Sequence, residues 1–129
     1  MAKIKQFEDL EIWQLARTLC NDINKLATRT DLRTDYKLYS QIDGSSGSTM
    51  DNIVEGFERN GNREFIQFLS IAKASCGETR SQLYRVYDRE YANEGEFKKL
   101  KEQTITLSKK IAAFMNYLSK SDLKGSKFK

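Results

Sequence analysis

The sequence has no histidine, no proline and only two cysteines among its 129 residues. Without histidine, the chain cannot build Ser-His-Asp or Cys-His catalysis, the Glu-x-x-His pairs of di-iron bundles or most zinc sites. The absence of proline removes the strongest helix breaker. We therefore expect a helical protein that is not an enzyme and that has no catalytic residues, no metal site and no cofactor.

Long apolar runs and a secretory leader are also missing. No stretch of about 18 apolar residues exists that could span a membrane, and the first residues lack the apolar core of a signal peptide. Cys20 and Cys76 lie within helical patterns, which is typical of buried thiols in a reducing compartment. We expect a cytoplasmic protein with no membrane contact; a disulfide between the two cysteines is the alternative.

Charge is plentiful, but it is unevenly distributed. The net charge is +4, and the segment from Ser119 to the end, with four lysines against Asp122, accounts for +3 of it. We expect residues 120–129 to form a flexible, solvated basic tail; a nucleic-acid-binding arm is the alternative. The body, at +1, would bind nucleic acid only if its charges gather on one face.

Apolar residues recur at helical spacing in a first segment, about residues 9–29. Asp9 is a candidate N-cap for this helix. Trp13 lies on its apolar stripe, so a core anchor is favoured over a ligand-stacking residue. The stripe consists of Leu10, Ile12, Trp13, Ala16, Leu19, Cys20, Ile23, Leu26 and Ala27.

The second segment gives conflicting signals. Asp31 or Thr34 could cap a helix there, and Leu38, Ile42 and Ile53 share one face. Between them the letters GSSGS resemble a flexible linker, because each glycine costs about 1 kcal/mol relative to alanine in a helix. Small residues at Gly44, Gly47 and Ser48 would, however, let another helix approach closely. From the residues alone, loop and helix are equally supported.

Two further helices follow more clearly. The third is expected over 62–89, after a turn in which Gly56 can end the preceding helix in the left-handed conformation and Asn60 or Asn62 can cap the next. The fourth is expected over 94–119, where Asn93 and Glu96 match a capping box. Its apolar residues alternate by three and four as an a/d heptad: Phe97, Leu100, Thr104, Leu107, Ile111, Phe114 and Leu118.

Four amphipathic helices joined by short connections predict an all-α, single-domain, antiparallel up-down-up-down four-helix bundle. The third and fourth helices carry more apolar residues than one seam needs, which indicates a subunit interface. These extra residues are Ile66, Ile71, Tyr84 and Tyr87 on the third helix and Ile105, Met115 and Tyr117 on the fourth.

Basic and aromatic side chains alternate along the third helix. Arginine beside an aromatic ring can hold a nucleic-acid backbone and stack on its bases. The candidate nucleic-acid-binding residues are Arg80, Tyr84, Arg85 and Arg89, with Lys109 and Lys110 on the fourth helix. The alternative is a solvated face on which nearby acids such as Glu78, Asp88, Glu90 and Glu102 pair with these cations.

Polar residues also interrupt the second and third helices. Glu55 and Glu78 could act as an acid/base pair. A structural role is favoured, in which Asn52, Glu55, Ser75 and Glu78 form hydrogen bonds between the two helices and fix their register.

The segments FEDLEIWQLA at 7–16, QI at 41–42 and SGSTMDNIVEGFERNGNREFIQFLSIAKASCGETRSQLY at 46–84 resemble the four-helix-bundle proteins encoded in intervening sequences of bacterial large-subunit ribosomal RNA genes. They are also similar to the accessory variability proteins of diversity-generating retroelements. The resemblance spans Phe7 to Leu118. The residues that carry it are Trp13, Gln41, Asn52, Glu55, Gly56, Phe65, Phe68, Ala72 and Glu78.

This resemblance implies that the GSSGS segment is helical, which sets the second helix at about 34–56. It also implies a homopentamer arranged as a ring, an RNA- or DNA-related or scaffold role, and a protein partner such as a reverse transcriptase. A module for protein–protein contacts without nucleic acid is the alternative. Relatives carry one or two arginines directly after the Gln-Ile or Gln-Leu pair, whereas this chain has Asp43 and Gly44 there.

Overall fold

The computed structural model describes residues 3–122 and contains four long helices. A short 3-10 turn, η1 (Phe7–Asp9), leads into α1 (Glu11–Arg29), and a second, η2 (Asp31–Thr34), leads into α2 (Tyr36–Phe57). The chain continues with α3 (Asn62–Asp88) and α4 (Glu94–Asp122). The predicted helix limits therefore agree with the structure to within three residues.

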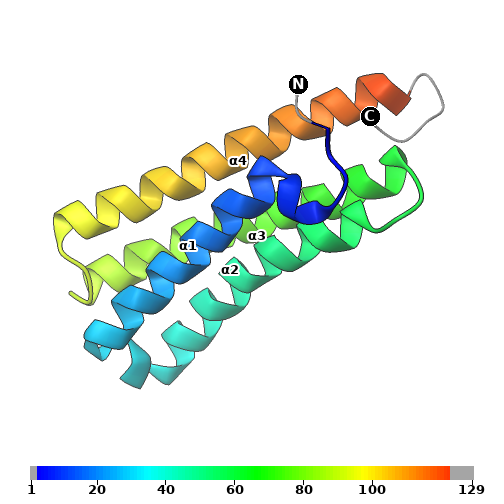
Figure 1. Cartoon of the computed structure of the whole chain (residues 1–129). Coiled ribbons are helices and arrows are strands. Elements are labelled where there is room, and N and C mark those ends of the chain that lie inside the picture. The colour runs from blue at the N-terminus through cyan, green and yellow to red at the C-terminus, as the bar shows by residue number, and fades with distance from the viewer. Residues whose placement is uncertain (1–2, 123–129) are drawn as a thin grey trace.

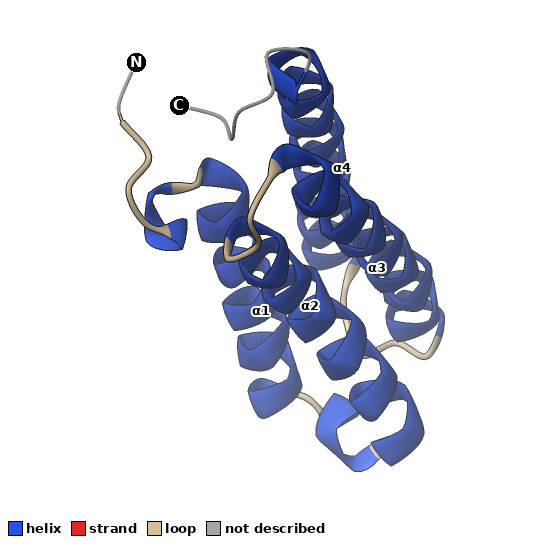
Figure 2. Ribbon diagram, turned by 90° about the vertical axis from the view of Figure 1, so that its right-hand side faces the viewer, coloured by secondary structure: helices blue, strands red, loops and turns tan. Residues whose placement is uncertain are grey.

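The four helices form a bundle in which each runs opposite to the one before it (Figures 1 and 2). The packing is closest between α2 and α3 and between α3 and α4, whereas α1 touches α2 and α4 less extensively. The all-α four-helix bundle is thus confirmed.

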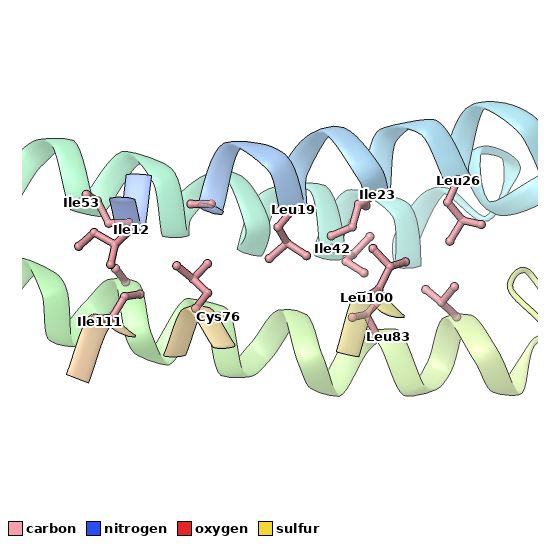
Figure 3. Close-up of a cluster of buried hydrophobic side chains, with 14 of the residues drawn as sticks. Ile12, Leu19, Ile23, Leu26, Ile42, Ile53, Cys76, Leu83, Leu100 and Ile111 are labelled. Atoms are coloured by element: carbon pink, nitrogen blue, oxygen red, sulfur yellow. The ribbon is translucent and has the colours of Figure 1, made fainter. Parts of the chain in front are cut away.

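The core is a continuous layer of apolar side chains along the bundle axis, and Figure 3 shows part of it. Leu19, Leu69 and Ile111 are all fully buried. Two residues of the predicted first stripe are less buried: Trp13 packs at the edge of the core, 5.1 Å from the ring of Phe7, and Cys20 is half-buried. Cys20 and Cys76 are both free thiols, as expected.

The start of α4 follows the predicted capping box. The Glu96 amide donates to the Asn93 side chain at 2.8 Å, and the Asn93 amide donates to the Glu96 carboxylate at 2.9 Å. The far end of α4 was predicted three residues too short, because the helix continues to Asp122. The expected flexible tail is therefore wrong for residues 120–122, and its remainder, 123–129, lies outside the described residues.

The GSSGS segment is helical and is stabilised by burial. Ser45, Ser46 and Thr49 are buried, although their hydroxyl groups are polar. The Ser46 hydroxyl donates to the Ile42 carbonyl at 2.8 Å, and the Thr49 hydroxyl donates to the Ser45 carbonyl at 3.0 Å. These two hydroxyls are therefore satisfied within α2. Packing against neighbouring helices offsets the low helix propensity of the two glycines.

Three of the predicted caps are wrong. Asp9 ends η1 and accepts from the amides of Lys5 and Gln6, and the N-cap of α1 is Leu10. Asp35, rather than Asp31 or Thr34, caps α2 by accepting from the Leu38 amide. The N-cap of α3 is Gly61, with φ of 153°, a backbone conformation that favours glycine. In each case another residue close by in sequence takes the capping position.

Gly56 does not adopt the left-handed conformation predicted for it; it lies buried inside α2. A Cβ at this position would lie 2.7 Å from the Phe65 ring and 2.9 Å from the Phe68 Cβ. Gly56 is therefore a point at which α2 and α3 approach very tightly. Gly44 and Gly47 were predicted to play that part, but a Cβ at either would meet no atom within 4 Å.

The apolar surplus on α3 and α4 is smaller than the sequence suggested. Ile66, Tyr87, Met115 and Tyr117 pack against the chain's own core. Ile71 and Tyr84 stay exposed, at 49% and 44%, and Tyr36 on α2 is 80% exposed. Within residues 3–122, no helix is long and apolar enough to cross a membrane.

Candidate nucleic-acid interface

The surface formed by α3 and α4 presents one exposed aromatic ring. Tyr84 packs edge-on against Phe97 of α4, with the ring centroids 4.9 Å apart. The Lys101 Nζ lies 5.4 Å from the Tyr84 centroid, within the range of a cation–π contact. The tyrosine is thus held in place from one side while 44% of it faces solvent.

Two more cations lie on the same side of α3. Lys73, Arg80 and Tyr84 are spaced by seven and four residues, which places them on one helix face. Both cations act on Cys76, whose S–H donates to the Thr104 carbonyl of α4 at 3.3 Å. Burial raises the pKa of the Cys76 thiol to about 11, while the charges of Arg80 and Lys73 oppose that rise. Both cations therefore lie near the α3–α4 seam.

We call Lys73, Arg80, Tyr84 and Lys101 the basic face. Among the described residues, none of its three cations forms an ion pair with an acid. Arg80 and Lys73 are exposed, and Lys101 is half-buried beside the aromatic rings. The face can therefore offer positive charge and a stacking surface together.

The remaining predicted nucleic-acid residues lie elsewhere. Arg89 donates to the Asp35 carboxylate of α2 at 2.8 Å, and Arg85, four residues earlier, lies on that same side of α3. Lys110 donates to Glu11 of α1 at 3.2 Å, and Lys109 is exposed on α4. Of the six predicted residues, only Arg80 and Tyr84 lie on the basic face.

Asp35 is the centre of a small polar cluster at one end of the bundle. Its carboxylate accepts from Arg89, from the Tyr91 hydroxyl at 2.9 Å and from the Leu38 amide. The hydrogen bond from Arg89 is the largest of the effects that lower the pKa of Asp35. The same carboxylate raises the pKa of the Tyr91 hydroxyl, because Tyr91 donates to it. The cluster ties the start of α2 to the end of α3.

A row of polar side chains joins α2 to α3 along their length. The Ser45 hydroxyl lies 2.8 Å from the Thr79 hydroxyl and donates to Gln82 Oε1 at 2.6 Å. The Ser48 and Ser75 hydroxyls lie 3.0 Å apart. We call these five residues the hydroxyl row. Its members fix the register of the two helices, as expected for polar groups in this seam.

The predicted seam residues take part unequally. Ser75 belongs to the hydroxyl row, and Asn52 supports it by donating to Ser48. Glu55 and Glu78 do not bridge the helices: both are exposed at the surface, and Glu55 pairs with Arg59 in the turn after α2. That part of the prediction is wrong, because both carboxylates lie on exposed sides of their helices and not in the seam. Of the other motif residues, Phe65 and Ala72 are buried, Phe68 is half-exposed and Gln41 is exposed.

The outward side of α2 is acidic. From Leu38 through Glu58 the chain has four carboxylates, Glu58 included, and no lysine or arginine. Gly44 and Gly47 leave a shallow depression there, bordered by Asp43, Asp51 and Glu55. Asp43 is thus part of a negative surface on the outer side of α2.

A groove runs between α1 and α4. Leu15, Thr18, Gln103 and Thr106 line it, with a volume of about 400 Å³. Gln103 donates to Asp22 of α1 at 3.1 Å, and its buried Oε1 has no hydrogen-bond partner among the described residues. Among residues 3–122, no three metal-ligating side chains cluster in this groove or elsewhere.

The geometry defines a helical bundle whose surface carries separate basic and acidic faces. The sequence model of the 23S rRNA-intervening sequence proteins matches residues 8–113, and the chain belongs to that family. No curated protein matches the chain in sequence.

Among solved structures, a bacterial protein has the same fold. It is a protein of unknown function from the S23 ribosomal protein family of Bacteroides thetaiotaomicron, with a TM-score of 0.73 and 18% sequence identity. The match covers 81% of this chain and 97% of the other. At this identity the likeness shows the fold alone.

Proposed function

We propose that this chain is a non-enzymatic, cytoplasmic protein that binds RNA or DNA through the basic face. The observation that carries the proposal is the exposed Tyr84 ring, with Arg80 and Lys101 beside it and, within residues 3–122, no acidic partner for either cation. Phosphate oxygens would take the place of those missing acids. The name of the family, which refers to an intervening sequence of 23S rRNA, is consistent with this role.

The chemistry favours an unpaired strand over a duplex. A single aromatic ring with neighbouring cations can stack one base and neutralise the adjoining phosphates, and such stacking contributes about 1–3 kcal/mol per base. The bases of a duplex are already stacked on one another, so the Tyr84 ring would find no free base to stack on. The proposed ligand is therefore a single-stranded loop or end of RNA or DNA.

Self-association is the second part of the proposal. We infer a homo-oligomer, with the homopentamer implied by the family resemblance as the expected size. Ile71 and Tyr36, exposed at 49% and 80%, support contacts with other protein surfaces. They also support the competing function, a scaffold that binds proteins such as a reverse transcriptase and no nucleic acid.

A salt series with a single-stranded oligonucleotide and a matching duplex tests the proposal. We expect binding to weaken steeply with salt, because each neutralised phosphate releases counterions. Arg80→Gln should lower the salt slope by about one. Lys109→Gln, which removes the same charge from another part of α4, should leave the slope nearly unchanged.

The tyrosine gives a second readout. Tyr84→Ala should weaken single-strand binding by about 5- to 150-fold, whereas Tyr84→Phe, which keeps the ring, should retain it. Thermal melting of both variants shows whether each is folded. An absence of binding at low salt, or equal effects of Arg80→Gln and Lys109→Gln, would favour the scaffold.

A further inference from the structure

The outward stripe of α2 and the stripe of α3 that carries the basic face have opposite charges at the same spacing. Asp51 of α2 and Glu58, the residue that directly follows α2 with a helix-like backbone conformation, are seven residues apart; on α3, Lys73 and Arg80 are also seven residues apart. Seven residues are about two turns, so each pair lies on one face with its charges about 10 Å apart along the helix. All four side chains are exposed.

The match extends to shape when the two stripes are aligned antiparallel. With Asp51 opposite Arg80 and Glu58 opposite Lys73, Gly47 falls opposite Tyr84. A Cβ at Gly47 would meet no atom within 4 Å, so there is room for a side chain from outside. Tyr84, 44% exposed, is the large side chain that would fill it.

The reverse fit occurs further along the same alignment, where Val54 of α2 falls opposite Gly77 of α3. Val54 is half-buried, and a Cβ at Gly77 would meet no atom within 4 Å. Each helix thus offers one side chain and one gap. Tyr84 of α3 fits the gap at Gly47, and Val54 of α2 fits the gap at Gly77, so the side chains interdigitate as in packed helices.

The parallel alignment fails the same test. Pairing Asp51 with Lys73 and Glu58 with Arg80 places Asn62 opposite Tyr84. Asn62 is buried, begins α3 and donates to the Leu118 carbonyl, so it cannot receive a ring from outside. The complementarity therefore specifies one direction.

We propose that α2 of one copy docks antiparallel on α3 of a second copy, with Asp51 and Glu58 against Arg80 and Lys73 of the basic face. The two surfaces differ, so the contact is heterologous, and a docked pair keeps one free α2 on one copy and one free basic face on the other, from which a ring can close. Because Arg80, Tyr84 and Lys73 are covered, assembly and nucleic-acid binding exclude each other. This second statement rests on the proposed function; the docking itself does not.

A charge swap on the full chain tests the docking without nucleic acid. One variant carries Asp51→Lys and Glu58→Lys, and the other carries Lys73→Glu and Arg80→Glu. Each alone has like charges on both stripes, so sedimentation velocity should show self-association at least tenfold weaker than in the parent chain. When the two are mixed, opposite charges face each other wherever the variants alternate, so mixed dimers and longer alternating assemblies should form, although a five-membered ring cannot alternate throughout. A mixture that stays monomeric, or either variant assembling alone as the parent does, overturns the docking.

A steric variant separates this contact from a general charge effect. Gly47→Gln fills the gap for Tyr84 and should weaken association at least tenfold. Ser40→Gln is the matched control: it lies seven residues earlier on the same stripe, and its opposite position in this register is Tyr91, beyond the end of α3 at Asp88. Equal association of the two variants overturns the register.

A single-stranded oligonucleotide added to the assembled parent chain tests the competition. We expect it to dissociate the assembly in proportion to its binding. Binding that leaves the assembly intact overturns mutual exclusion. An absence of binding to monomers at low salt overturns the proposed function together with the competition, whereas the docking is judged by the mixing experiment alone.

Discussion

The seam between α2 and α3 and the seam between α1 and α4 are built differently. The first is narrow, with Gly56 pressed against Phe65 and with the hydroxyl row along its length. The second is wide, and long polar side chains bridge it: Gln103 to Asp22, Lys110 to Glu11 and Arg29 to Glu96. Short side chains in a narrow seam cannot move aside for added atoms, whereas long side chains can change conformation to accommodate a substitution. The bundle should therefore tolerate substitution on one side much better than on the other.

Gly56→Ala should produce the largest loss of stability. The added Cβ would lie 3.1 Å from the Phe65 carbonyl oxygen and closer still to two phenylalanine side chains, so the helices must move apart. Overpacking costs about 1–3 kcal/mol. Urea denaturation measures it. Gly44→Ala is the control: its Cβ meets no atom within 4 Å, and we expect a gain of up to about 1 kcal/mol from helix propensity.

The hydroxyl row should give the next largest effect. Ser45→Ala leaves Gln82 Oε1 and the Thr79 hydroxyl without their partner across the seam, at a cost of about 1–3 kcal/mol. The double variant with Ser45→Ala and Thr79→Val should lose less stability than the sum of the losses in the two single variants. In the double variant, neither hydroxyl is left facing a missing partner across the seam. Strict additivity in denaturation experiments would show that the row adds nothing to the close packing.

Asp35→Asn tests the polar end of the same seam through pH. The pKa of Asp35 is lowered in the folded chain, so its contribution to stability is present above the ordinary value of about 3.9 and is lost as the pH falls through the folded-state pKa. We expect the Asp35→Asn variant to be less stable than the parent chain at pH 7 and equally stable near pH 2. If the difference in stability between the parent chain and the Asp35→Asn variant stayed constant from pH 7 to pH 2, that result would contradict a role for the charge.

Changes in the α1–α4 seam should have the smallest effects. Glu11→Gln removes an exposed ion pair with Lys110, and such pairs contribute about 0–1 kcal/mol. Gln103→Met removes a buried oxygen that has no partner among the described residues and also the hydrogen bond to Asp22, so the two effects oppose each other and we expect little net change in stability. If either change lowered the free energy of unfolding by more than about 2 kcal/mol, the α1–α4 seam would not be more tolerant of substitution than the α2–α3 seam.

The parts of the fold that could be predicted are those decided by neighbouring residues. The Asn93–Glu96 capping box needs only four residues, and the heptad of α4 repeats within one segment. The role of Gly56 could not be found in this way, because it depends on Phe65 and Phe68 from the next helix. Residue propensities left the GSSGS segment undecided for the same reason, and the family resemblance resolved it correctly.

The candidate site was predicted only in part. Regular spacing suggested that Arg80, Arg85 and Arg89 act together, but a step of five residues turns Arg85 and Arg89 away from the side of α3 that carries Arg80. Lys101 was missed because its place beside Tyr84 depends on the antiparallel pairing of α3 with α4. Lys73 could have been found, since it lies on the same helix face as Arg80 and Tyr84.

The two ends of the bundle are held by different interactions, and two carboxylates stabilise one of them. Asp35 caps α2 and binds Arg89, and Glu96 caps α4 and binds Arg29, so two connections depend on ionised acids. The pKa of Glu96, like that of Asp35, is lowered, chiefly by the amide of Asn93. The opposite end is closed by aromatic rings, with Phe65 and Phe114 centred 5.5 Å apart. Mild acid should therefore reduce hydrogen-exchange protection at the carboxylate end first, so that the bundle frays from one end while the aromatic end remains closed.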